Sequence, residues 1–149
     1  MKQFFLLLCC ALLVGCGGGG DGGGDSTPAA TGTKPVINRV GMVVNTSTGY
    51  IQVDRFQVGD YANFVVDVTD PDLDISELEL SQFYPSNATT PIYGPDIVPL
   101  GTQTDANVYI SLFDDEYITG PKGNWRGEFI VRDKAGNEST PFVIYTVVE

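Results

Sequence analysis

Residues 59–70 read GDYANFVVDVTD, and this stretch decides the fold class. Every second position in its centre is apolar, namely Ala62, Phe64, Val66 and Val68. A period of two is that of a β-strand, whose side chains alternate between two faces. The run ends at D-P-D-L-D over residues 70–74, where proline and aspartate interrupt a strand. The stretch therefore predicts a half-buried strand followed by an acidic turn.

The same alternation recurs along residues 35–149. The segments that show it are 36–44, 50–56, 78–84, a loose strand at 92–98, 108–112, 125–131 and 142–148. In the first of them Val36, Val40, Met42 and Val44 are expected on one face. The one helical candidate, residues 75–80, alternates better as a strand. Seven to eight short strands, with turn signals at roughly ten-residue spacing, predict an all-β sandwich.

The first residues are typical of an export signal. A short basic start precedes the apolar run FFLLLCCALLV at residues 4–14. As a helix this run would rise about 16 Å, roughly half of a bilayer core, so it cannot span a membrane. It matches the apolar region of a secretory signal peptide.

The four residues Leu13-Val14-Gly15-Cys16 resemble the lipobox of bacterial lipoproteins. In that family the cysteine thiol receives a diacylglyceryl group, the signal is cleaved before the cysteine, and the new amino group is acylated. The resemblance implies that residues 1–15 are a signal peptide, that Cys16 is lipidated, and that the chain is held on a membrane. In this family an aspartate after the cysteine is the usual signal for inner-membrane retention. Gly17 stands there, so the outer membrane is expected.

Residues 17–34 read GGGGDGGGDSTPAATGTK and lack any large apolar side chain, which predicts a flexible tether. With Cys16 the tether covers 16–34, and residues 35–149 form one domain. The remaining cysteines, Cys9 and Cys10, lie in the signal peptide. The exported domain is therefore expected to hold no thiol and no disulfide.

Two stretches resemble bacterial immunoglobulin-like domains. Residues 59–70 are similar to their second strand, and WRGEFIVRDKAGN at 125–137 is similar to their last hairpin, which ends in D-x-A-G-N. In such a hairpin Asp133 can accept hydrogen bonds from the N–H groups of the turn, and Gly136 and Asn137 tolerate positive φ. The resemblance implies an immunoglobulin-like β-sandwich of seven to eight strands, a fold that hosts many functions.

Composition excludes several classes of function. The chain has no histidine, which removes Ser-His-Asp and Cys-His catalysis and the usual zinc and haem sites. Its net charge of −11 would repel a nucleic-acid backbone, so no nucleic-acid partner is expected. No cofactor is required by any motif, and we expect no enzymatic activity.

The sharpest polar cluster is D-x-x-D-x-D-x-D at residues 67–74. Ca²⁺ takes six to eight oxygen ligands, which closely spaced carboxylates can supply. In an immunoglobulin-like sandwich the loops after residues 69 and 132 lie at one end, so the candidate ligands are Asp67, Asp70, Asp72, Asp74, Asp133 and Asn137. An acidic turn that is simply solvated remains the alternative. The tether also enters at this end, which is therefore expected to face the membrane.

The opposite end is expected to carry a long loop from Asp114 to Asn124. Its candidate partner-binding residues are Asp114, Asp115, Glu116, Tyr117 and Lys122, which would suit a basic partner.

The function expected from the sequence is a lipid-anchored, non-enzymatic module of the bacterial envelope, in adhesion, assembly or structural support. The alternative is a small carbohydrate-binding or hydrolase accessory module, for which Trp125 and Tyr109 would supply an exposed aromatic surface. The partner expected from these hypotheses is an envelope protein or a glycan.

Overall fold

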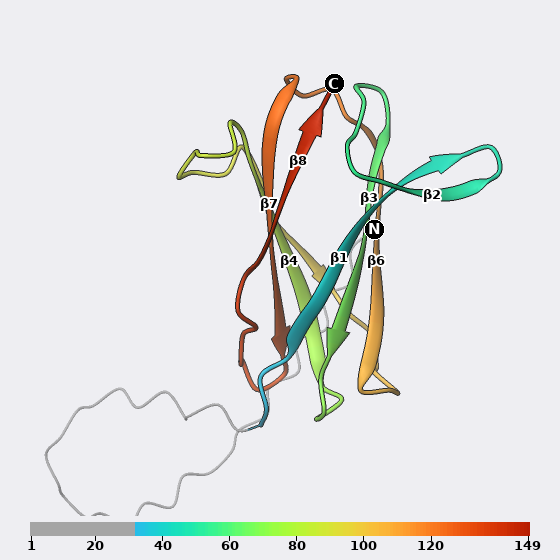
Figure 1. The fold of residues 1–149 in the computed structure, drawn as a ribbon. Helices are drawn as coiled ribbons and strands as arrows, with labels where there is room; N and C mark the ends of the chain where they lie inside the picture. The colour runs from blue at the N-terminus through green and yellow to red at the C-terminus, as the bar shows by residue number, and fades with distance from the viewer. Residues whose placement is uncertain (1–31) are drawn as a thin grey trace, which may run out of the picture.

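The computed structural model describes residues 32–149, except for the side chains of residues 113–116. The signal peptide, Cys16 and most of the tether therefore lie outside the described residues. Within the described part all regular structure is β (Figure 1). The eight strands are β1 (Val36–Thr46), β2 (Gly49–Val53), β3 (Tyr61–Thr69), β4 (Ile75–Phe83), β5 (Tyr93–Pro99), β6 (Asn107–Tyr117), β7 (Gly123–Asp133) and β8 (Phe142–Val148).

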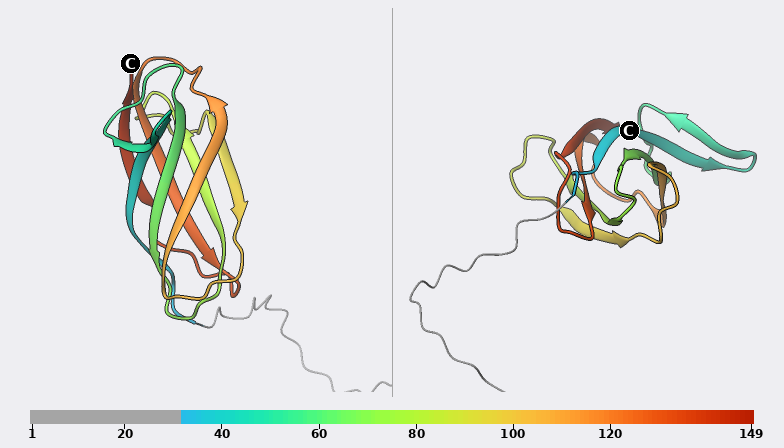
Figure 2. Two further views of the ribbon diagram at one scale, coloured as in Figure 1. Left: turned by 90° about the vertical axis from the view of Figure 1, so that its right-hand side faces the viewer. Right: turned by 90° about the horizontal axis from the view of Figure 1, so that it is seen from below.

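The strands form two antiparallel sheets that face each other, as the two views of Figure 2 show. One sheet has the order β2-β1-β3-β6 and the other β5-β4-β7-β8. In the immunoglobulin scheme β1, β3 and β6 occupy the places of strands A, B and E, and β5-β4-β7-β8 those of C′-C-F-G. The expected immunoglobulin-like β-sandwich is confirmed, and residues 75–80 belong to a strand.

The core consists of the inward rows of the two sheets. Phe64, Val66 and Val68 of β3 pack with Trp125, Phe129 and Val131 of β7, and all six are buried. Phe56, in the connection before β3, is also buried and exchanges two backbone hydrogen bonds of 3.0 Å with Val147 and Glu149. These bonds tie the end of β8 to the opposite sheet, because Phe56 leads directly into β3.

The first strand departs from simple alternation. Val36 was expected on the inner face with Val40, but it is 54% exposed and its neighbour Ile37 is buried. The register against β3 shifts between Ile37 and Arg39, which marks an irregularity in the ladder. Such a shift moves every side chain before it to the other face of the sheet.

The long loop expected from Asp114 to Asn124 is also corrected. Strand β6 continues through Tyr117 and β7 begins at Gly123, so only residues 118–122 connect them. Backbone pairing explains the difference, because Tyr117 still pairs with Tyr61 of β3 after a register shift.

The two ends of the sandwich differ in what they carry. The described chain begins at the lower end in Figure 1, where the backbone N–H of Thr33 donates to the Asp72 carboxylate of the β3–β4 loop. At the other end Ile118 and Asp60 hold the β6–β7 connection against the segment before β3. We call these the tether end and the far end. Between residues 32 and 149 there is no helix with the length and apolarity needed to cross a membrane.

Candidate functional site

At the tether end, Asp70 organises the β3–β4 loop from inside. Its side chain is 0% exposed. Its carboxylate accepts backbone N–H groups of Asp74 at 2.8 Å, Ile75 at 3.1 Å and Asp72 at 3.4 Å. Its own N–H donates to the carbonyl of Ala106 at 2.8 Å. Where a strand ends, its backbone N–H groups lose their partners on the neighbouring strand. A short acidic side chain can accept hydrogen bonds from the N–H groups of the residues that follow it, and so satisfies them in the turn.

Asp74 lies in a strongly negative environment. Partial burial, and then the carboxylates of Asp133, Asp70 and Asp72, raise the pKa of Asp74, while Lys134 lowers it to a smaller extent. Its Oδ1 atom is buried and has no hydrogen-bond partner in the described residues. The fold therefore favours the protonated, neutral form of this group more than water does.

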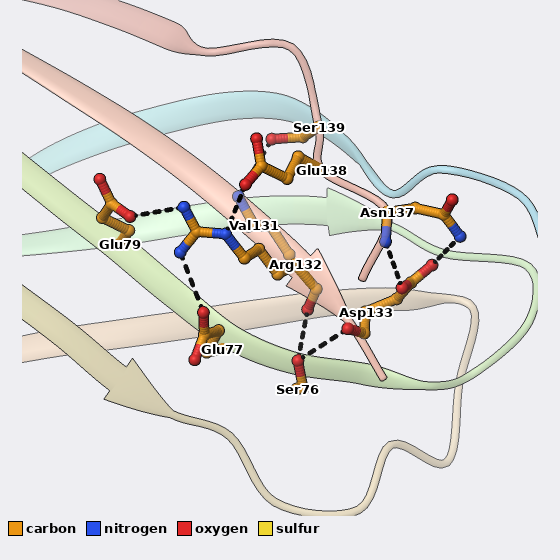
Figure 3. A network of polar contacts seen from close by, with 9 residues as sticks. All are labelled: Ser76, Glu77, Glu79, Val131, Arg132, Asp133, Asn137, Glu138 and Ser139. Carbon is orange, nitrogen blue, oxygen red and sulfur yellow. Dashed lines mark hydrogen bonds and ion pairs between the residues drawn. The ribbon is translucent and has the colours of Figure 1, made fainter. Parts of the chain in front are cut away.

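The β7–β8 turn confirms the sequence interpretation of D-x-A-G-N. The Asp133 carboxylate accepts the backbone N–H of Asn137 at 2.7 Å and its side-chain amide at 2.6 Å (Figure 3). Gly136 has a φ of 86°, a conformation that glycine adopts without strain. The hydrogen bonds between Asp133 and Asn137 thus close this turn.

Beside this turn, Arg132 is held by three glutamates (Figure 3). Its guanidinium contacts Glu77 at 2.9 Å, Glu79 at 2.7 Å and Glu138 at 2.7 Å. These hydrogen bonds raise the pKa of Arg132. The group ties β4, β7 and the β7–β8 turn together, so we assign it a structural role.

Four of the six candidate calcium ligands belong to one electrostatic cluster, because Asp70, Asp72 and Asp133 all act on Asp74. Asp67 lies apart on β3, where its carboxylate accepts from the amide of Asn38 at 3.2 Å. Among the side chains that the structure describes, which leave out residues 113–116, no three acidic groups lie together so that they could hold a metal ion. The internal hydrogen bonds account for Asp70 and Asp133 without a cation, and calcium binding stays a prediction.

The candidate partner surface is at the far end. Tyr117 is 55% exposed at the end of β6, and Lys122 lies exposed in the 118–122 connection. The side chains of Asp114, Asp115 and Glu116 are outside the described residues. The ring of Tyr117 packs on that of Tyr61, with centroids 4.0 Å apart. The backbone carbonyl of Lys122 accepts a hydrogen bond of 3.0 Å from the Tyr84 hydroxyl.

The two aromatic residues considered for carbohydrate binding do not share a surface. Trp125 is only 6% exposed inside the sandwich, and its indole N–H donates to the Pro121 carbonyl at 2.9 Å. Tyr109 is 65% exposed on β6, on the outer side of the other sheet. Trp125 and Tyr109 therefore do not form one exposed aromatic surface.

A hollow of about 380 Å³ opens between the two sheets at the far end. Its apolar walls include Phe56 and Phe64 on one side and Trp125, Ile144 and Val148 on the other. Tyr93 and Asp96 of β5 and Tyr117 of β6 also line it, and all three are exposed. This size lies within the range of small-molecule sites in proteins.

The sequence did not indicate Asp96 as a site residue. Its segment, Y-G-P-D at 93–96, lies in the loose strand expected at residues 92–98, even though glycine and proline are depleted in strands. The structure pairs it nevertheless as an edge strand, with Asp96 opposite Leu80 of β4. Gly94 permits this, because its φ is 88° and a Cβ there would lie 2.5 Å from the Leu80 carbonyl oxygen.

No protein-family model matches the chain, and no curated protein matches it in sequence. Among solved structures it is similar to a Niemann-Pick type C2 protein from Japanese carpenter ant, with a TM-score of 0.52 and 8% identity over 80% of this chain and 96% of that one. It is also similar to the PmoD soluble domain from Methylocystis sp. (Rockwell), with a TM-score of 0.43 and 12% identity over 76% and 97%. At 8% identity the likeness to the Niemann-Pick type C2 protein shows the immunoglobulin-like fold alone.

Proposed function

We propose that this chain is a lipid-anchored, non-enzymatic binding module of the bacterial cell envelope. Cys16 would hold it on the membrane, most simply on the outer membrane, and the domain would bind an envelope component in adhesion or assembly. The lipobox-like residues 13–16 and the glycine-rich segment after them support the anchor.

The observation that carries the binding role is the separation of the two ends. The described chain starts beside Asp72, whereas the 380 Å³ hollow and the exposed Tyr117 and Lys122 lie at the far end. An anchor at the N-terminus therefore leaves the far end free to meet a partner. Loops and openings on a rigid sandwich are where binding surfaces concentrate.

The anchor is tested by Cys16→Ser in the full chain, with Cys10→Ser as the matched control. We expect the wild type and Cys10→Ser to sediment with membranes after a high-salt wash, because lipid chains hold a protein independently of salt. Cys16→Ser should remain unprocessed or be released. A Cys16→Ser protein that is cleaved and still sediments after that wash would refute the lipid anchor.

Proximity labelling in cells from two positions tests whether the far end of the domain faces the partner. A probe at Thr119 lies at the far end, and a probe at Lys134 lies beside the β3–β4 loop at the tether end. We expect the Thr119 probe to label envelope proteins and the Lys134 probe to label mainly lipid-proximal material. The reverse pattern would show that the far end does not face the partner.

A further inference from the structure

The hollow at the far end is shaped before any ligand enters, because its tryptophan is fixed on several sides. The Trp125 indole is hydrogen-bonded to Pro121 and stacks on Tyr93 with ring planes 6° apart and centroids 6.0 Å apart. Gly120 lies so close that a Cβ there would be 2.8 Å from the indole ring. A rigid aromatic wall loses little conformational entropy when a ligand binds to it.

One acidic and one basic residue line the hollow, and they differ in how their charges are paired. Asp96 lines the hollow and is exposed, and its carboxylate has no hydrogen bond or ion pair with any other described residue. The other charged residue of the lining is Arg126, whose two terminal nitrogens donate to the carbonyls of Ser86 and Ala88 at 3.0 Å. Its Nε lies 3.1 Å from the Glu128 carboxylate.

The positive charge of Arg126 is thus compensated and directed into the β4–β5 connection, and the guanidinium also lies 3.9 Å above the ring of Phe83. The negative charge of Asp96 is uncompensated. The whole chain adds to this field, since its net charge is −11. An anion would meet repulsion at this opening, and a cation would be attracted.

We propose that the hollow binds a small organic cation whose body is apolar, such as an aryl- or alkylammonium compound. The apolar body would lie between Phe56, Phe64 and Trp125, and the ammonium group would lie at the opening near Asp96. Aromatic walls suit such a ligand, because ring faces attract cations as well as bury apolar surface. This inference rests on the proposed function, since it names what the binding module binds.

The test uses the fluorescence of Trp125, the single tryptophan of the chain, so the signal comes from the site itself. The purified full chain is titrated with 3-phenylpropylammonium, 3-phenylpropan-1-ol and 3-phenylpropanoate, which share a body and differ in charge. We expect a saturable change with the ammonium compound. Its Kd should be about two- to fivefold below that of the alcohol, as for one ion pair at an exposed rim, and the carboxylate should bind more weakly than both.

Two variants isolate the charge. Asp96→Asn should bring the Kd of the ammonium compound up to that of the alcohol and leave the alcohol unchanged, which also shows that the hollow is intact. Asp105→Asn removes one negative charge from the β5–β6 connection at the tether end and should change neither Kd, because an asparagine oxygen can still accept the Asn107 N–H.

Three results would overturn the inference. These are no saturable signal with any probe, equal or tighter binding of the carboxylate, and equal effects of the Asp96 and Asp105 variants. None of them would bear on the anchor, because membrane sedimentation of the Cys16 variants does not involve the hollow. A released Cys16→Ser protein likewise leaves the titration interpretable.

Discussion

Replacement of Asp70 by alanine should destabilise the domain far more than any other change in the acidic loop. The Asp70 carboxylate is 0% exposed and accepts two short hydrogen bonds, from Asp74 at 2.8 Å and Ile75 at 3.1 Å. A hydrogen bond to a charged acceptor contributes about 1.5–3 kcal/mol. The third contact, at 3.4 Å from Asp72, is too long to add much. We therefore expect the free energy of unfolding to fall by about 3–5 kcal/mol.

Thermal and denaturant unfolding, followed by circular dichroism, measure this loss. A loss of that size lowers the Tm of a domain of about 115 residues by about 10–20 °C. Asp70→Asn should fall between the wild type and Asp70→Ala, because the amide keeps one acceptor oxygen. The matched control is Asp72→Ala in the same loop, where the side chain is exposed and the expected change is within about 0.5 kcal/mol. An Asp70→Ala protein no less stable than Asp72→Ala would show that the carboxylate does not organise the loop.

Three further predictions concern single groups. Asp74→Asn should raise Tm at neutral pH, because the raised pKa of Asp74 means that its charged form is disfavoured in the fold; this gain should vanish below about pH 4, where the unfolded carboxylate is also protonated, and a gain that is independent of pH would contradict the electrostatic cause. Thr146→Val should raise the free energy of unfolding by about 1–2 kcal/mol, and with it the denaturant midpoint, because the buried Thr146 hydroxyl has no hydrogen-bond partner in the described residues. A fall in the free energy of unfolding would show that this hydroxyl has a partner. If the acidic cluster around Asp74 binds Ca²⁺ as predicted from the sequence, Tm should rise in roughly 0.1–10 mM Ca²⁺ relative to EDTA, and much less with NaCl at equal ionic strength; an unchanged Tm would contradict calcium binding.

The sequence alone was sufficient to predict the fold class, because apolar and polar residues alternate along a strand that is buried on one face. Residues 62–68 and 125–131 show this period without interruption, and both are inward rows of the sandwich. The turn at Asp133–Asn137 was equally predictable, since its hydrogen bonds connect residues four apart. Local chemistry of this kind needs no knowledge of the rest of the chain.

Tertiary structure alone decided the features that depend on pairing between distant segments. The register shift after Ile37 arises in the pairing of β1 with β3. The extension of β6 through Tyr117 depends on its pairing with Tyr61. Neither feature can be predicted from the residues of the strand alone. The hollow is built by residues from both sheets, and Asp96 stands at its opening only because an edge strand with glycine and proline pairs with β4. Its uncompensated charge depends in turn on which partners hold Arg126. Such partners are brought together by the packing of the sheets, and the order of residues along the chain does not specify them.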